Sequence, residues 1–174
     1  MLIKIREIPA LGLHLEVPLE SAIVADALAG RDADLGASQV GVVLSVTRSD
    51  EEVLVRGRLI GSTILPCARC LAEVKVALEA PIQSLFVPAA RAADEEAEDE
   101  ADYLPHDGVA VEIGDLLRGA LILAVPMASL CRPDCKGLCT VCGGDRNQKD
   151  CGCRVAFEDL RLASLKGLKL NSNQ

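Results

Sequence analysis

The sequence predicts an α+β protein with an antiparallel β meander or small barrel-like sheet, a buried helix, a Cys-rich module and a short terminal helix. Three observations predict it. Successive segments alternate apolar and polar residues and are separated by short polar connections, as in hairpin-linked strands. One apolar stretch near residue 120 has helical spacing. Six of the eight cysteines crowd into the 23 residues from Cys131 to Cys153.

The length of 174 residues suits one ordinary domain with a small appended module. We expect a β-rich body over residues 1–126, with an acidic loop at 89–105 and a buried helix at 114–125. Residues 127–174 form the Cys-rich module with a terminal amphipathic helix.

The first half of the chain is expected to be mainly strands. Residues 21–29 predict one short helix, with Ser21 as N-cap and Gly30 as its stop. A polar connection follows over 31–38, and the polar residues 48–51 have the size of a hairpin turn. Pro81 is expected to interrupt the last strand. The expected strands cover residues 11–17, 39–47, 52–65 and 71–86.

The second half changes character. Seven carboxylates fall in residues 94–102, which favours a solvated loop over an interaction tail or a cation site. A short strand at 109–113 precedes the helix, which Asp115 is expected to cap. Because that helix is apolar nearly all round except at Arg118, we expect it to be buried against the sheet. Residues 157–170 predict a basic amphipathic helix, more readily one that caps the sheet than one that binds a partner.

Composition limits the functions open to the chain. It has three aromatic residues and a net charge of −8, so stacking on bases and a broad phosphate-neutralising surface are both poorly supported. A local basic patch is still allowed. The N-terminus lacks the continuous apolar region of a signal peptide, and no uncharged run approaches the ~20 residues of a membrane span. We therefore expect a cytoplasmic protein.

In a reducing cytosol, eight cysteines at these spacings favour a metal over disulfides. The strongest signal is Cys139-x-x-Cys142-Gly, in which a tight turn aims two sulfurs at one ion and the glycine lets backbone amides point at sulfur. Cys151 and Cys153 can complete a four-sulfur set, and nearby Lys and Arg residues would offset its negative charge.

The remaining four cysteines are Cys67, Cys70, Cys131 and Cys135, and a second zinc held by them would clamp a strand tip to the end of the buried helix. Two sites are favoured over one; in the competing partition Cys131 or Cys135 joins the C-terminal set and another cysteine is left over. Because every candidate ligand is sulfur, structural zinc is favoured over catalytic zinc, with an iron–sulfur cluster as the alternative.

No other chemistry stands out. His14 and His106 are isolated and are expected to be ordinary surface histidines. No nucleophile elbow, phosphate loop or dinucleotide glycine signature is present. The sequence therefore predicts neither catalytic residues nor a cofactor other than zinc, and we expect no enzyme activity.

Several motifs occur in an order that resembles a known family. They are Cys67-Ala-Arg-Cys70-Leu, an acidic linker, Ile113-Gly-Asp-Leu, a Cys-Lys-Gly-Leu-Cys-x-x-Cys-Gly-x-x-x-Asn segment from Cys135, and an Arg-Leu-Ala-x-Leu-Lys ending at 161–166. Together they resemble the YceD family of bacterial large-ribosomal-subunit RNA accumulation proteins, from about residue 10 to 169.

The resemblance implies a non-enzymatic cytoplasmic factor that supports normal levels of 23S ribosomal RNA. Its expected partner is a ribosomal protein or a pre-ribosomal particle of the large subunit; direct contact with ribosomal RNA, through the terminal helix or through Arg69 and Arg132, stays open. No membrane and no small-molecule substrate are implied. The alternative hypothesis is a metal-handling or thiol-redox protein in which the cysteines are the working groups.

Overall fold

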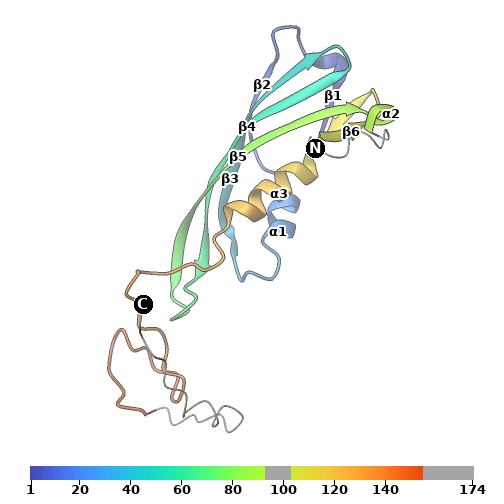
Figure 1. Ribbon diagram of the computed structural model, residues 1–174. Coiled ribbons are helices and arrows are strands. Elements are labelled where there is room, and N and C mark those ends of the chain that lie inside the picture. Colours follow the sequence, from blue (N-terminus) through green and yellow to red (C-terminus); the bar gives the residue numbers. More distant parts are fainter. Residues whose placement is uncertain (93–102, 155–174) are drawn as a thin grey trace, which may run out of the picture.

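The computed structural model describes residues 1–92 and 103–154. These residues are mostly β sheet with few helices, which confirms the predominance of strands predicted from the sequence (Figure 1). In chain order the elements are β1 (Leu2–Lys4), the 3₁₀ helix η1 (Ile5–Glu7), β2 (Leu13–Pro18), α1 (Ser21–Ala27), β3 (Asp34–Ser49), β4 (Glu52–Pro66), β5 (Glu73–Pro88), α2 (Ala89–Ala92), β6 (Tyr103–His106), β7 (Ala110–Glu112) and α3 (Gly114–Ala124).

The main sheet has five strands in the order β2-β3-β4-β5-β6, and β1 pairs with β7 in a separate two-stranded sheet. Strands β2 to β5 form the expected antiparallel meander. Strand β6 lies parallel to β5, so the sheet is mixed. Its edges, β2 and β6, do not pair with each other, and the described strands therefore form an open sheet without the closure of a barrel.

The hydrophobic core lies on the face of the sheet that α1 and α3 cover (Figure 1). It is almost entirely aliphatic; Phe86, 1% exposed, is its one aromatic side chain among the described residues. Helix α3 contributes Leu117 and Leu121, both fully buried. Burial of each such side chain is worth about 1.5–3 kcal/mol, so packing of α3 is a large part of what holds the body together.

Two glycines in β4 leave room for the backbone of its neighbour β3 to approach closely. A Cβ at Gly57 would lie 2.0 Å from the Val43 carbonyl oxygen, and one at Gly61 would lie 2.3 Å from that of Gln39. Both contacts are with backbone, which cannot swing aside as a side chain can. Glycine at these positions is therefore required by the coiling of the long hairpin.

The hairpin turns are tighter than the sequence suggests. Ser49 pairs with Glu52, so only two residues turn between β3 and β4, and Asp50 takes the left-handed conformation at φ 52°.

Strand β5 continues through Pro81, contrary to expectation. At Pro81 only β4 is a neighbouring strand, because β6 pairs solely with Leu85–Pro88. Proline is tolerated where one edge of a strand is unpaired.

Both expected helix caps are wrong. Helix α1 begins at Ser21 itself after Glu20, and α3 begins after Ile113; neither has a side-chain cap. Asp115 instead lies in the first turn of α3, where its negative charge interacts favourably with the positive end of the helix dipole. The helix is also buried on one face only, since Leu123 is 84% exposed.

Strand β3 extends further than predicted. It begins at Asp34, inside the expected connection 31–38, and its pairing with β4 shifts register between Asp34 and Gln39. The Asp34 side chain holds this irregular segment by accepting hydrogen bonds from the N–H groups of Gly36 and Ala37. Such local side-chain bonding obscures a strand in the sequence pattern.

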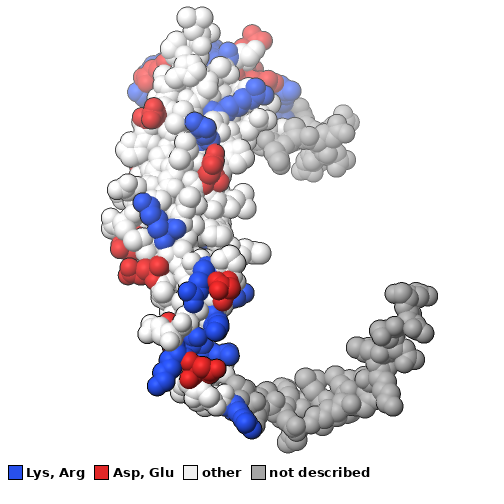
Figure 2. Space-filling model, turned by 90° about the vertical axis from the view of Figure 1, so that its left-hand side faces the viewer, with Lys and Arg blue, Asp and Glu red and all other residues white. Residues whose placement is uncertain are grey.

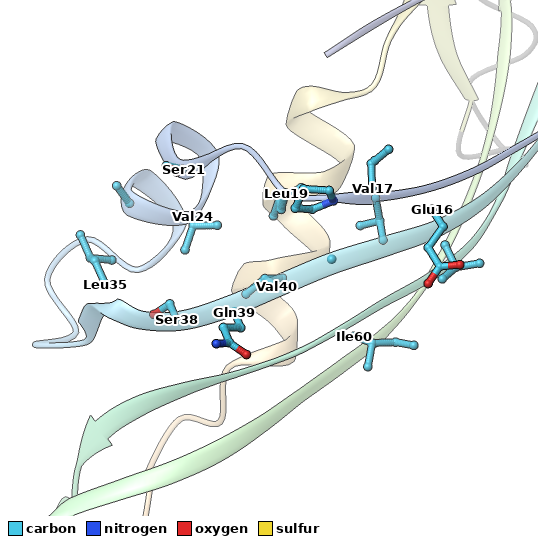
Figure 3. Close-up of a pocket in the computed structure, with 15 residues that line it drawn as sticks. Glu16, Val17, Leu19, Ser21, Val24, Leu35, Ser38, Gln39, Val40 and Ile60 are labelled. Atoms are coloured by element: carbon cyan, nitrogen blue, oxygen red, sulfur yellow. The ribbon is translucent and has the colours of Figure 1, made fainter.

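A groove of about 1050 Å³ lies beside this segment, between α1, the end of β2 and β3 (Figure 3). Its lining is largely apolar, including Val24, Leu35 and Ile60, with Glu16 as the charged residue at one side. Leu35 and Ile60 are 50% and 42% exposed. The groove exists because β2 stops at Pro18, opposite Gly41, while β3 continues past it.

Two expectations lie outside the described residues: most of the acidic loop, at 93–102, and the terminal amphipathic helix. The division of the chain at residue 126 stays a prediction. No described helix combines the length and the apolar character that crossing a membrane would require.

Replacing Gly57 by alanine should lower the free energy of unfolding by about 2 kcal/mol or more, because the new methyl group must displace the β3 backbone. Urea unfolding of the purified chain measures this. Gly119→Ala is the matched control: nothing lies within 4 Å of its Cβ position, and it sits within α3. That change should raise stability by up to about 1 kcal/mol, and equal losses in both variants would contradict the close approach.

Candidate metal centres

The structure brings the eight cysteines together in two groups of four, the partition that the spacing favours over a single site. The shared group comprises Cys67, Cys70, Cys131 and Cys135; the local group comprises Cys139, Cys142, Cys151 and Cys153. Within each group every sulfur lies within 4.8 Å of the others, and no cysteine is left over. Each group could hold a metal ion.

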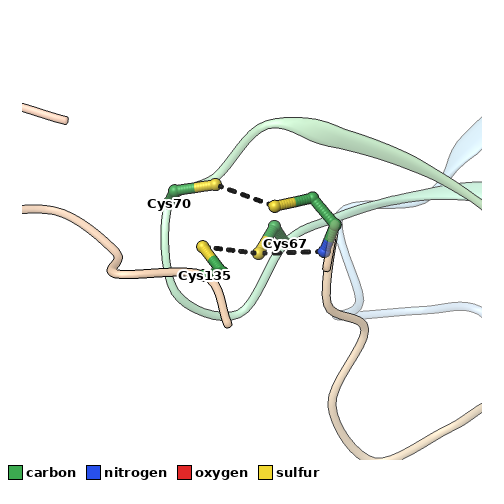
Figure 4. Close-up of side chains that lie close together, drawn as sticks. Cys67, Cys70 and Cys135 are labelled. Carbon is green, nitrogen blue, oxygen red and sulfur yellow. Dashed lines mark hydrogen bonds between the residues drawn. The ribbon is translucent and has the colours of Figure 1, made fainter. Parts of the chain in front are cut away.

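Two sulfur–sulfur distances in the shared group are those of a tetrahedral site. Cys67 Sγ lies 3.9 Å from Cys135 Sγ, and Cys70 Sγ lies 3.7 Å from Cys131 Sγ (Figure 4). Four sulfurs placed 2.3 Å from a central zinc are about 3.8 Å apart. A disulfide would need about 2.05 Å, and none of the eight cysteines forms one.

The tip between β4 and β5 carries the first two cysteines of the shared group, at the position in the fold that the sequence predicts. After β4 the chain makes a tight turn in which the Cys67 N–H donates to the Ala72 carbonyl at 2.8 Å. The Leu71 N–H donates back to the Cys67 carbonyl at 2.9 Å. The turn places Leu71 at φ 62°, a left-handed conformation that costs a non-glycine residue about 1–2 kcal/mol.

The local group repeats this turn bond for bond. The Cys139 N–H donates to the Gly144 carbonyl at 2.8 Å, and the Gly143 N–H donates to the Cys139 carbonyl at 2.8 Å. Gly143, at φ 71°, occupies the position that Leu71 occupies in the first turn. The two Cys-x-x-Cys segments are therefore equivalent knuckles, one with the glycine that the geometry favours and one without it.

Hydrogen bonds fasten the segment after α3 to the β4–β5 tip independently of any metal. The Ala68 N–H donates to the Ser129 carbonyl at 2.8 Å, and the Ser129 hydroxyl donates to the Pro66 carbonyl at 2.6 Å. The Arg69 guanidinium donates to the Cys135 carbonyl at 2.8 Å. Arg69, a candidate RNA contact in the sequence, is thus engaged in holding the two segments together.

Gly137 allows the closest approach at this junction. Its φ is 70°, and a Cβ there would lie 2.8 Å from the Arg69 carbonyl oxygen. That same oxygen accepts the Leu138 N–H at 3.0 Å. The glycine of the Cys-Lys-Gly-Leu-Cys motif therefore serves both the backbone turn and the contact between the two cysteine segments.

Asn147 is a structural residue whose role the sequence reasoning missed. Its Oδ1 accepts the Lys136 N–H at 2.8 Å and the Arg132 guanidinium at 2.7 Å. Its Nδ2 donates to Cys135 Sγ at 3.4 Å and to Asp145 at 2.7 Å. The asparagine in the family-like motif, four residues after Gly143, was the available signal. It joins the shared group to the loop that carries the local group.

Each group contains thiols whose pKa is lowered and thiols whose pKa is raised. The Cys131 N–H, followed by the backbone at Arg69, lowers the pKa of Cys67 to about 6. The backbone N–H groups of Cys142 and Val141 lower the pKa of Cys139 to about 6. By contrast, hydrogen bonding with Cys135 raises the pKa of Cys131 to about 12, and hydrogen bonding with Cys151 raises that of Cys153 to about 12.

This division has a simple electrostatic cause. Four thiolates within one small volume repel one another, so ionisation of one raises the pKa of its neighbours. A divalent cation among them removes the repulsion and favours all four thiolates. The N–H groups aimed at Cys67 and Cys139 are the donors that a metal-thiolate centre requires around it.

The two groups differ in burial. In the shared group Cys67 is 0% exposed and Cys135 is 3% exposed, since two segments close over them. In the local group only Cys139 is buried, and Cys142, Cys151 and Cys153 are exposed. The shared group is therefore half shielded by the fold, with Cys70 partly exposed and Cys131 exposed, whereas three of the four sulfurs of the local group belong to exposed residues.

The histidines lie away from both groups. His14 is exposed on β2, as expected. His106, expected at the surface, is 6% exposed in β6. Its Nδ1 accepts the Gly108 N–H at 2.9 Å, and its Nε2 lies 2.7 Å from the Glu51 carbonyl oxygen, to which it donates. The ring thus ties β6 to the β3–β4 turn, a satisfied structural role.

A β-rich protein carrying two four-cysteine groups of metal-ligating geometry is the class that this fold and site define. The chain belongs to the YceD family: it matches the family described as large ribosomal RNA subunit accumulation protein YceD over residues 55–169. That match includes the β4–β5 tip and every cysteine.

Similar proteins occur in mycobacteria and are named uncharacterized. One from Mycobacterium tuberculosis (strain H37Rv) and one from Mycobacterium bovis are each 36% identical over 101 residues, covering 58% of this chain and 48% of the relative. One from Mycobacterium leprae is 31% identical over 104 residues, covering 60% and 48%. The chain thus spans about half the length of the curated relatives it matches. No solved structure matches it.

Replacing Leu71 by glycine should raise the free energy of unfolding by about 0.5–1 kcal/mol, because the left-handed strain disappears and the lost side chain is 64% exposed. Chemical denaturation measures this. Leu123→Gly is the control, since Leu123 is also exposed but lies in α3. It should lower stability by about 1 kcal/mol, and a loss of stability in Leu71→Gly as well would refute the strain at this knuckle.

Proposed function

We propose that this chain is a non-enzymatic, cytoplasmic factor in biogenesis of the large ribosomal subunit, supporting the synthesis, processing or stability of 23S ribosomal RNA. The observation that carries this proposal is membership of the YceD family, whose description names accumulation of the large ribosomal RNA. The partner is a ribosomal protein or a pre-ribosomal particle of the large subunit. Neither a membrane nor a small-molecule substrate takes part.

Each cysteine group holds one structural zinc ion in this proposal. The support is the chemistry of the donor sets: each consists of four sulfurs, with no position evidently reserved for water or substrate. Zinc in the shared group fastens residues 131–135 to the β4–β5 tip. Zinc in the local group fixes the loop from Cys139 to Cys153. Binding energy at such sites is folding energy, so the metal acts as scaffold.

A second candidate function has one observation in its favour. Cys142, Cys151 and Cys153 are exposed, so oxidants and competing metal ligands can reach the local group. A thiol-redox or metal-handling protein would use that exposure as its working chemistry. The two functions predict different effects of removing one thiol from a chain that still folds: a thiol-based function is lost, whereas a scaffold function is retained.

Metal analysis of the purified chain should find two zinc ions per molecule. Cys67→Ser should reduce this to one and lower the unfolding temperature strongly, because it opens the junction between the body and residues 131–135. Cys151→Ser should also leave one zinc but disturb mainly the local loop. Iron, or a visible absorption band, would instead indicate a cluster with the same ligands.

Depletion of the protein in its host should lower 23S relative to 16S ribosomal RNA and reduce free large subunits. Re-expression of the wild-type chain should restore both, and Cys67→Ser should not. Cys151→Ser separates the two candidates. Retained 23S rescue by this variant would reject thiol chemistry at the local group. Lost rescue supports thiol chemistry only if the variant still holds two zinc ions and melts normally, so that the local loop is intact. Unchanged 23S levels on depletion would reject the ribosomal role.

A further inference from the structure

Three cations gather beside the cysteine groups. Lys136, Arg146 and Lys149 line one hollow of about 320 Å³, together with Asn147, Gln148 and Asp150. All three cationic side chains are exposed. In Figure 2, Lys and Arg side chains are denser at the lower end of the view than over the sheet. We call Lys136, Arg146 and Lys149 the basic triad.

The neighbouring carboxylates of Asp134, Asp145 and Asp150 form their hydrogen bonds and ion pairs with groups other than the basic triad. Asp145 accepts the N–H and the side-chain amide of Asn147, at 2.8 and 2.7 Å. Asp150 accepts the Gly152 N–H at 3.1 Å, and Asp134 lies 3.6 Å from Arg132. Within residues 1–92 and 103–154, the side chains of the basic triad form neither an ion pair nor a hydrogen bond.

The cysteine sulfurs do not hold these cations either. The donors aimed at sulfur are the backbone N–H groups of Cys131 and Val141 and the side-chain amide of Asn147. No Lys or Arg side chain in the described residues donates to a sulfur. Among nearby Lys and Arg residues, which the sequence suggests could offset thiolate charge, Lys136, Arg146 and Lys149 thus make no direct side-chain contact with sulfur, and their hydrogen-bonding capacity is unused.

The backbone carrying the basic triad is fixed at all three positions. The Lys136 N–H donates to Asn147 Oδ1 at 2.8 Å, the Arg146 N–H donates to the Gly137 carbonyl at 3.0 Å, and the Lys149 N–H donates to the Asp145 carbonyl at 3.2 Å. A surface whose backbone is already ordered loses less conformational freedom when it binds. Three such cations on an ordered backbone suit an anionic partner.

We propose that the basic triad binds the phosphate backbone of RNA. Residues 127–154 contain no aromatic side chain, so the contact is with phosphates and does not include stacking on bases. It is independent of base sequence and sensitive to salt. The inference rests on the proposed function in one respect: the family's link to ribosomal RNA selects RNA among polyanions.

The test measures fluorescence anisotropy of a labelled 20-nucleotide RNA, single-stranded and as a duplex, with the full zinc-loaded chain across a salt series. Neutralisation of three phosphates predicts a slope of log K against log salt of about −2 to −3. The variant Lys136→Gln/Arg146→Gln/Lys149→Gln should bring this slope close to zero and weaken binding at least tenfold at 50 mM salt.

The matched control is Lys4→Gln/Arg56→Gln/Arg58→Gln, which removes the same net charge from exposed positions on the body. It should keep the slope and lose less than threefold in affinity. Zinc content and unfolding temperature must match the wild type in both variants; if the triple variant fails this check, Lys149→Glu alone should still flatten the slope by about one to two.

Three results would overturn the inference: no RNA binding by the wild-type chain at 50 mM salt, equal weakening by the control variant, or equally strong binding of polyglutamate, which would identify a general polyanion or an acidic protein as the ligand. Rescue of 23S levels is a separate readout. A triad variant that cannot bind RNA but restores 23S RNA supports the surface assignment and shows that the ribosomal role proceeds through another contact.

Discussion

The junction at the β4–β5 tip is the constraint on which the C-terminal part of the structure depends. Every hydrogen bond that the described residues form between 127–154 and the rest of the chain has its partner between Pro66 and Cys70. A segment of 28 residues without a hydrophobic core of its own is thus hydrogen-bonded to the body through only five residues. Four sulfurs arranged for one ion are the natural means of securing so small a contact.

The sequence was most informative where a pattern has a single physical cause. Period-2 alternation located β2 to β5. The positions of the cysteines placed Cys67 and Cys70 at a strand tip and grouped them with Cys131 and Cys135, which lie beside them in the structure. Strand β6 was not predictable in the same way. Its four residues, Tyr103–His106, include a proline and join β5 in parallel across a long connection, so no local alternation marks them.

Residues whose role depends on backbone geometry in the folded chain could not be identified from the sequence either. Asn147 and Leu71 act through hydrogen bonds and a left-handed turn that only the folded chain defines. His106 looked like a loop residue because its partner, the Glu51 carbonyl, lies 55 positions away. The charge of the basic triad was visible in the sequence, but its availability was not. Whether the three cations are free depends on which groups the carboxylates of Asp134, Asp145 and Asp150 contact in the folded chain.

The two cysteine groups span loops of different length and therefore depend differently on prior folding. The local group spans 14 positions and can assemble within one short peptide, whether or not the sheet has formed. Cys67 and Cys131 are 64 positions apart, and closing the longer loop costs about 1 kcal/mol more in chain entropy unless the hairpin and α3 have already formed. If both groups hold metal, an ion in the shared group therefore reports on the body: it binds well only to a chain in which the hairpin and α3 have already formed.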